Sequence, residues 1–107
     1  MATMSARERR LSLHLPVEVV GQDATGGWFA ESTRSLNVSA GGICFDSLHN
    51  LAVGSRLTLQ IALPPPLRSH FGGSAAYRVG ATICRVEHLE GQRAYRASAR
   101  FLGEVES

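Results

Sequence analysis

Two groups of residues in this sequence have the types and spacing to hold an anionic ligand. The first is Arg7, Arg9 and Arg10, which fall within four residues near the chain start. A guanidinium can take two phosphate oxygens at once and can lie flat on a planar ring, so an arm that carries these residues could close over an anion. A charge run is otherwise most simply a solvated surface. The cluster therefore predicts either a ligand-binding arm or a solvated basic tail.

The second group is the segment NVSAGG, residues 37–42, which interrupts an apolar run. Asn and Ser side chains hydrogen-bond to nearby backbone groups and fix turns, and glycine allows a positive φ or a close approach at Gly41 or Gly42. An ordinary connection between strands is one interpretation. The other is a binding corner, where Asn37 and Ser39 project polar groups and glycine leaves room for a ring against the backbone.

Other chemistry has little support in the sequence. We find no nucleophile with a local base, no paired carboxylates and no phosphate-cradling loop before a helix, so neither an enzyme nor a cofactor is expected. The four His are scattered and no metal site is predicted. Cys44 and Cys84 lie in apolar runs and are predicted to be buried, reduced thiols.

Composition indicates one globular domain in the cytoplasm. The chain has 107 residues, of which 44% are hydrophobic and 19% charged, as in folded domains. A net charge of +2 argues against a protein that coats polyanions in general. No apolar run approaches the ~20 residues that span a bilayer, and the N-terminus lacks the apolar core of a signal peptide. We therefore expect no membrane insertion.

The hydrophobic pattern has a period of two, which is typical of strands with one buried face. Three consecutive prolines at 64–66 predict an extended polyproline loop, Gly80 predicts a bulge or bend, and no segment has a helical stripe. We expect an all-β fold, a small six-stranded antiparallel β-barrel. Its strands are predicted over residues 14–21, 28–38, 42–47, 56–63, 75–89 and 92–102.

The predicted organisation has three parts. Residues 1–12 form a flexible arginine-rich arm, 13–103 the barrel, and 104–107 a short tail.

Three features together resemble the PilZ domain family. They are the arginine cluster, the strand that begins LPV at Leu15, and the NVSAGG turn. The signature of the family is R-x-x-x-R in an N-terminal arm, followed by [D/N]-x-S-x-x-G. Residues 37–42 match the second motif at every specified position, and the resemblance covers roughly residues 7–103. The arginine motif departs from the family: Arg10 takes the place of its second arginine, and Ala6 stands where the first would be.

The resemblance implies a β-barrel that binds cyclic di-GMP, the bacterial second messenger, and performs no chemistry. Ligand binding would order the arm, which would then present a new face to an unidentified downstream protein. The family often has a C-terminal helix on the barrel, and residues 104–107 are too few to form one. The barrel mouth would then be open, or covered by the proline loop or a partner. The implied ligand residues are Arg7, Arg9, Arg10, Asn37, Ser39, Gly41 and Gly42.

Two alternatives stay open. Ala6 favours a degenerate PilZ domain that binds no nucleotide and works as a protein–protein adaptor, for example in pilus or motility control. An OB-like or SH3-like barrel that binds nucleic acid would need basic and aromatic residues interleaved on exposed strands. Arg96 and Arg100 supply charge, but Tyr95 and Phe101 are predicted to point inward, so nucleic acid is not the expected partner.

Overall fold

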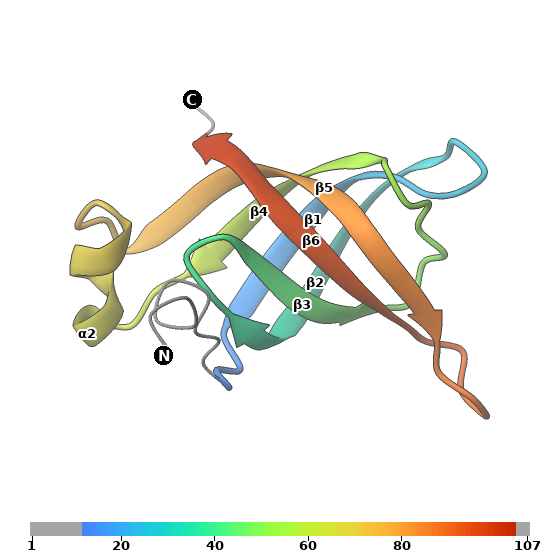
Figure 1. Cartoon of the computed structure of the whole chain (residues 1–107), viewed down its shortest axis with the longest axis horizontal. Coiled ribbons are helices and arrows are strands. Elements are labelled where there is room, and N and C mark those ends of the chain that lie inside the picture. The colour runs from blue at the N-terminus through green and yellow to red at the C-terminus, as the bar shows by residue number, and fades with distance from the viewer. Residues whose placement is uncertain (1–11, 105–107) are drawn as a thin grey trace, which may run out of the picture.

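Six antiparallel strands close into one barrel (Figure 1). A computed structural model describes residues 12–104. The strands follow the barrel in the order β1-β2-β3-β6-β5-β4, so each has a partner on both sides and the sheet has no open edge. This confirms the predicted all-β barrel. Their bounds are β1 Pro16–Gln22, β2 Trp28–Val38, β3 Gly42–Ser47, β4 Arg56–Ala62, β5 Ala76–His88 and β6 Tyr95–Glu104. Most of the predicted arm and tail lies outside the described residues, so the division into three parts stays a prediction.

Alternating apolar side chains from all six strands fill the barrel interior. Burial of these side chains is the main favourable term in folding, and the period of two puts them on one face of each strand. Every second residue from 57 to 63 and from 79 to 83 is buried, as a period of two requires. The strand residues of this hydrophobic core cluster are Val17, Val19, Val38, Ile43, Phe45, Leu57, Leu59, Ile61, Val79, Ala81, Ile83, Ala97 and Ala99.

Two register shifts interrupt the pairing of β5 with β6. At the first, after Gly80, the extra residue is Leu102 of β6, so the bulge predicted at Gly80 lies on the partner strand and β5 keeps its alternation there. A second shift makes Ile83 and Arg85 pair with the consecutive residues Ala99 and Ser98, so Cys84 is an extra residue in the ladder. Cys84 is therefore exposed, and the prediction that it is buried was wrong, whereas Cys44 is buried as predicted.

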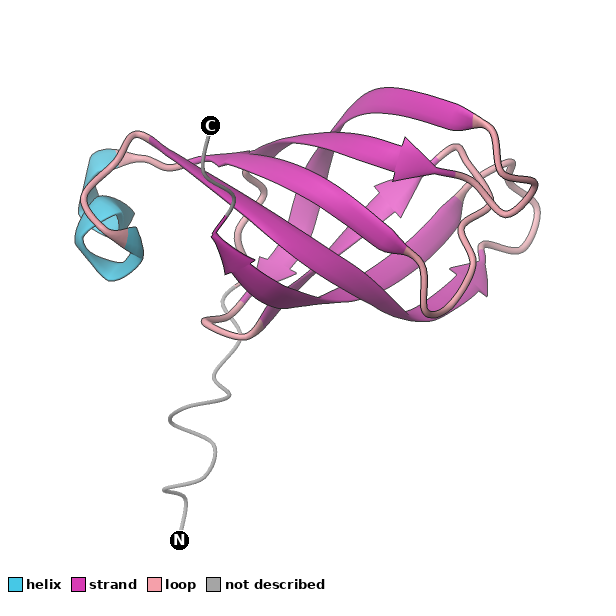
Figure 2. Cartoon of the chain, turned by 90° about the horizontal axis from the view of Figure 1, so that it is seen from above, coloured by secondary structure: helices cyan, strands magenta, loops and turns pink. Residues whose placement is uncertain are grey.

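The three prolines do not form the predicted polyproline loop. Pro64 is extended, with φ −69° and ψ 155°, but a one-turn helix α2 follows at Pro65–Arg68, and then the 3₁₀ turn η1 at Ser69–Phe71 (Figure 2). Proline fits the first turn of a helix because its φ is already helical and the N–H it lacks would have no helical partner. Leu67 and Phe71 pack against the core. The proline segment therefore covers part of the barrel core at the end where β4 stops.

The antiparallel order gathers several segments at one end of the barrel. Pro16 at the start of β1 pairs with Arg34 near the end of β2, and Val17 pairs with Ile61 near the end of β4. The β2–β3 turn, the start of β1 and α2 therefore share this end (Figure 1). The loops 23–27 and 48–55 lie at the other end, where the Ala24 N–H donates to the Asn50 carbonyl at 2.7 Å. Within residues 12–104, no helix is long and apolar enough to cross a membrane.

Candidate functional site

The turn between β2 and β3 is built around the Ser39 hydroxyl. Its oxygen accepts hydrogen bonds from the N–H groups of Gly41 and Gly42, both at 3.2 Å. The Ser39 N–H donates to the Gly42 carbonyl at 2.9 Å and closes the turn. Within the described part of the chain, the only acceptor for the hydroxyl proton is the Gly42 carbonyl at 3.5 Å, which is long for an O–H donor. Ser39 therefore fixes the turn and keeps a donor that a ligand could use.

The two glycines of the turn differ in their surroundings. A Cβ on Gly42 would collide with the Ala99 carbonyl oxygen of β6, so the close approach that glycine allows here is to the protein's own backbone. Gly41 is exposed, and a Cβ there would meet no atom within 4 Å. Neither glycine has a positive φ, so of the two predicted reasons for glycine the structure shows the close approach, at Gly42. Gly41 leaves open space against the backbone.

Asn37 follows a bulge in β2. Ser35 pairs with Phe45 and Asn37 with Cys44, so Leu36 is the extra residue in the ladder. The shift leaves Asn37 half-buried beside Cys44. The structure thus brings together four predicted site residues, Asn37, Ser39, Gly41 and Gly42, at one corner. The other three, Arg7, Arg9 and Arg10, lie outside the described residues.

The chain that leads into β1 is fastened to β2 by Ser35, directly before this corner. Ser35 is completely buried. Its hydroxyl accepts from the Leu15 N–H at 2.9 Å and donates to the Leu13 carbonyl, and its own N–H donates to the Leu15 carbonyl at 2.9 Å. The His14 ring donates through Nδ1 to the Ser35 carbonyl at 3.1 Å, since a carbonyl can only accept. We call residues 13–15 the arm root.

Sequence reasoning missed Ser35. A signal was present, because Ser35 is a polar residue at an inward position of β2, and a buried hydroxyl needs partners. Those partners are backbone groups about 20 residues away, and only the pairing of β1 with β2 identifies them.

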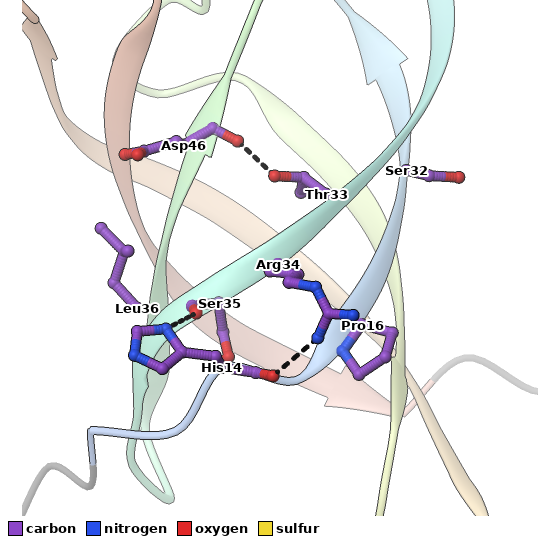
Figure 3. Close-up of a pocket in the computed structure, with 8 residues that line it drawn as sticks. All are labelled: His14, Pro16, Ser32, Thr33, Arg34, Ser35, Leu36 and Asp46. Atoms are coloured by element: carbon purple, nitrogen blue, oxygen red, sulfur yellow. Dashed lines mark hydrogen bonds between the residues drawn. The ribbon is translucent and has the colours of Figure 1, made fainter.

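A groove of about 550 Å³ lies beside the arm root (Figure 3). This volume falls within the usual range of small-molecule sites, roughly 300–1,000 Å³. The Arg34 guanidinium lies in the groove and donates to the His14 carbonyl at 3.2 Å. The lining runs along β2 as far as Leu36, which is next to Asn37. The lining residues are His14, Pro16, Ser32, Thr33, Arg34, Ser35, Leu36 and Asp46.

Asp46 closes the far side of the groove and is itself held in place. The Thr33 hydroxyl donates to the Asp46 carbonyl at 2.6 Å, and the Asp46 carboxylate accepts from Nε of Arg96 at 3.0 Å. The hydrogen bond and the charge of Asp46 raise the pKa of Arg96 above its ordinary value. The Arg96 guanidinium is therefore already occupied by a partner within the protein.

Solved structures share this barrel at low sequence identity. The Bacillus subtilis inhibitor of motility MotI/DgrA gives a TM-score of 0.65 at 21% identity over 90% of this chain, which spans only 42% of that protein. The PilZ domain of CeSA from a cellulose-synthesizing bacterium gives 0.56 at 18% identity, over 92% of this chain and 83% of that one. The PilZ domain of Escherichia coli YcgR, solved with cyclic di-GMP, gives 0.53 at 16% identity, over 90% and 78%. Comparison with curated proteins gives no match.

The sequence itself places the chain among these barrels. The family model of the PilZ domain matches residues 5–105, from the arginine cluster through the last strand. This match favours a PilZ barrel over an OB-like or SH3-like barrel. The NVSAGG turn, the closed barrel and the family match agree, and the chain belongs to the PilZ domain family.

Proposed function

We propose that this domain is a receptor and adaptor module that binds cyclic di-GMP. The observation that carries the proposal is the fastening of the arm root to Ser35, two positions before Asn37. Arg10 is three residues from Leu13, and an extended chain spans at most ~3.6 Å per residue. The length of chain between them therefore limits the arm arginines to about 11–22 Å from the fastened root, which is close enough for the proposed arm to reach the corner at Asn37.

Each part of the site has a matching part of the ligand. The guanidinium groups of Arg7, Arg9 and Arg10 suit phosphates and the acceptor edge of guanine. Ser39 offers a hydroxyl donor, Asn37 an amide, and Gly41 an open surface for a flat base. Two related structures support this choice of ligand, since the YcgR PilZ domain was solved with cyclic di-GMP and Klebsiella pneumonia MrkH as a cyclic di-GMP complex.

Binding would act through the arm. The ordered arm would cover the corner at β2–β3 and present a new surface to a downstream protein. Ala6 favours a second candidate, a degenerate domain that binds no nucleotide and acts as a protein–protein adaptor, because one arginine of the family motif is missing.

Calorimetric titration with cyclic di-GMP tests the proposal. We expect Arg10→Ala and Ser39→Ala each to weaken binding, because a charge-assisted hydrogen bond is worth about 1.5–3 kcal/mol, or roughly ten- to hundredfold in affinity. Arg96→Ala is the control and should change the affinity little, since Asp46 holds that guanidinium. Absence of heat with the wild-type protein at high micromolar nucleotide would favour the degenerate adaptor instead.

A further inference from the structure

Arg100 is an exposed cation beside the NVSAGG turn, and it has no ion-pair partner among the described residues. Across residues 12–104 the structure contains two ion pairs, Arg85–Glu87 and Arg96–Asp46, and neither involves Arg100. Arg96 and Arg100 share the outer face of β6, because Ala97 and Ala99 between them point into the core. Of these two outward arginines, Asp46 holds only Arg96.

The backbone fixes Arg100 against both glycines of the turn. Gly42 is the direct cross-strand partner of Arg100. A Cβ on Gly42 would lie 3.5 Å from the Arg100 Cα, and the N–H of the next residue, Phe101, donates to the Gly41 carbonyl at 2.9 Å. Gly42 is buried and contributes no side chain beside Arg100, whereas the adjacent Gly41 is exposed. The Arg100 side chain therefore starts at the edge of the open surface over Gly41.

A guanidinium at this place is suited to read a base. Its planar fork donates two N–H groups in parallel, which matches the O6 and N7 acceptors of guanine. Adenine offers N7 but has an amino donor in place of O6, so the same fork cannot make both bonds. We infer that Arg100 is a specificity-determining residue that binds the O6/N7 edge of the guanine lying on the NVSAGG turn. This inference rests on the proposed function.

Titration with two nucleotides distinguishes recognition of the guanine base from electrostatic attraction of the phosphates. Cyclic di-GMP and cyclic di-AMP carry the same phosphates, so a residue that only attracts phosphate affects both alike. Wild-type protein and the variants Arg100→Ala, Arg100→Lys and Arg56→Ala would each be titrated with both. Arg56 is the matched control, because it is exposed in the same cross-strand row as Arg100, with Thr82 of β5 between them.

We expect Arg100→Ala to weaken cyclic di-GMP binding about ten- to hundredfold and to leave cyclic di-AMP binding unchanged. The preference for guanine should shrink by the same factor. Arg100→Lys should resemble Arg100→Ala, because an ammonium keeps the charge but lacks the fork. Arg56→Ala should keep both affinities, and thermal unfolding of each variant would show that the barrel is intact.

Three outcomes would overturn the inference. Equal weakening of both nucleotides by Arg100→Ala would make Arg100 a phosphate contact. Wild-type affinity of Arg100→Lys for cyclic di-GMP would show that only the positive charge at this position matters. Wild-type affinity of Arg100→Ala for cyclic di-GMP would show that Arg100 is not part of the site, while the proposed function would stand. Failure of the wild-type protein to bind cyclic di-GMP would overturn the proposed function, and the role of Arg100 with it.

Discussion

Gly41 and Gly42 are neighbours in the sequence but meet different constraints. The constraint on Gly42 comes from packing, because β6 passes so close that a methyl group would strike the Ala99 carbonyl. Gly41 is under no such constraint, since space around it is open and its φ is not positive. A functional role for Gly41 therefore depends on a ligand that packs against its backbone, whereas Gly42 is needed for the packing of β3 against β6.

Alanine at each glycine tests this division. We expect Gly42→Ala to lower the free energy of unfolding by about 1–3 kcal/mol, the usual cost of overpacking, because backbone must move to admit the methyl group. Gly41→Ala should leave stability unchanged or raise it by up to about 1 kcal/mol, since it reduces the entropy of the unfolded chain. Urea unfolding of both variants measures the difference. Equal destabilisation would contradict the packing explanation for Gly42.

Residues defined by local spacing could be predicted, and those defined by strand pairing could not. Asn37, Ser39 and Gly42 belong to one six-residue motif, so the sequence alone marks them as candidate site residues. Arg100 lies 58 positions after Gly42 and meets it only through the pairing of β3 with β6. No spacing along the chain shows that contact.

At the scale of elements, β2 connects the arm root to the candidate site. The hydroxyl of Ser35 holds Leu13 and Leu15, and the bulge that follows sets the position of Asn37. An arm fastened here loses less conformational entropy when it closes over a ligand than a free arm would. The link between β1 and β2 would therefore contribute to the proposed binding without touching the ligand.

Ser35→Ala should weaken this link, because the two hydrogen bonds of the hydroxyl are lost while those of the Ser35 backbone remain. The substitution leaves the buried Leu15 N–H without its acceptor, which costs about 1–3 kcal/mol. We expect a lower free energy of unfolding, faster hydrogen exchange at the Leu15 amide and weaker binding of cyclic di-GMP. Ser32→Ala is the matched control on the same strand, because its hydroxyl bonds to Glu18 on the exposed face. A Ser35→Ala variant with unchanged exchange at Leu15 would contradict this account of the arm root.

The strands were predictable because burial alternates along them, and the errors arose where another constraint prevailed. In β5 the extra residue at Cys84 breaks the alternation, and no residue type there indicates a bulge. At Pro65 and Pro66, a fixed φ fits both polyproline and the first turn of a helix. Packing of Leu67 and Phe71 against the core accompanies the helical form.

For the whole molecule, the barrel separates the candidate site from the loops at its opposite end. There the Asp23 carboxylate organises the β1–β2 loop by accepting from the Thr25 hydroxyl at 2.7 Å, the Thr25 N–H at 2.9 Å and the Gly27 N–H at 3.0 Å. The Thr25 hydroxyl, followed by the N–H groups of Gly27 and Thr25, lowers the pKa of Asp23 below its ordinary value.

This separation predicts that Asp23 affects stability but not binding. Because its folded pKa is lowered, Asp23 stabilises the protein fully above its unfolded pKa of about 3.9, and this contribution is lost as the pH falls through the folded pKa. Asp23→Ala should therefore lower Tm at neutral pH, and its difference from wild type should close on acidification. Asp23→Asn is the control, since its amide oxygen still accepts hydrogen bonds but does not titrate in this range. Cyclic di-GMP affinity at neutral pH should be the same in all three proteins, and a loss in Asp23→Ala would show that the two ends of the barrel are coupled.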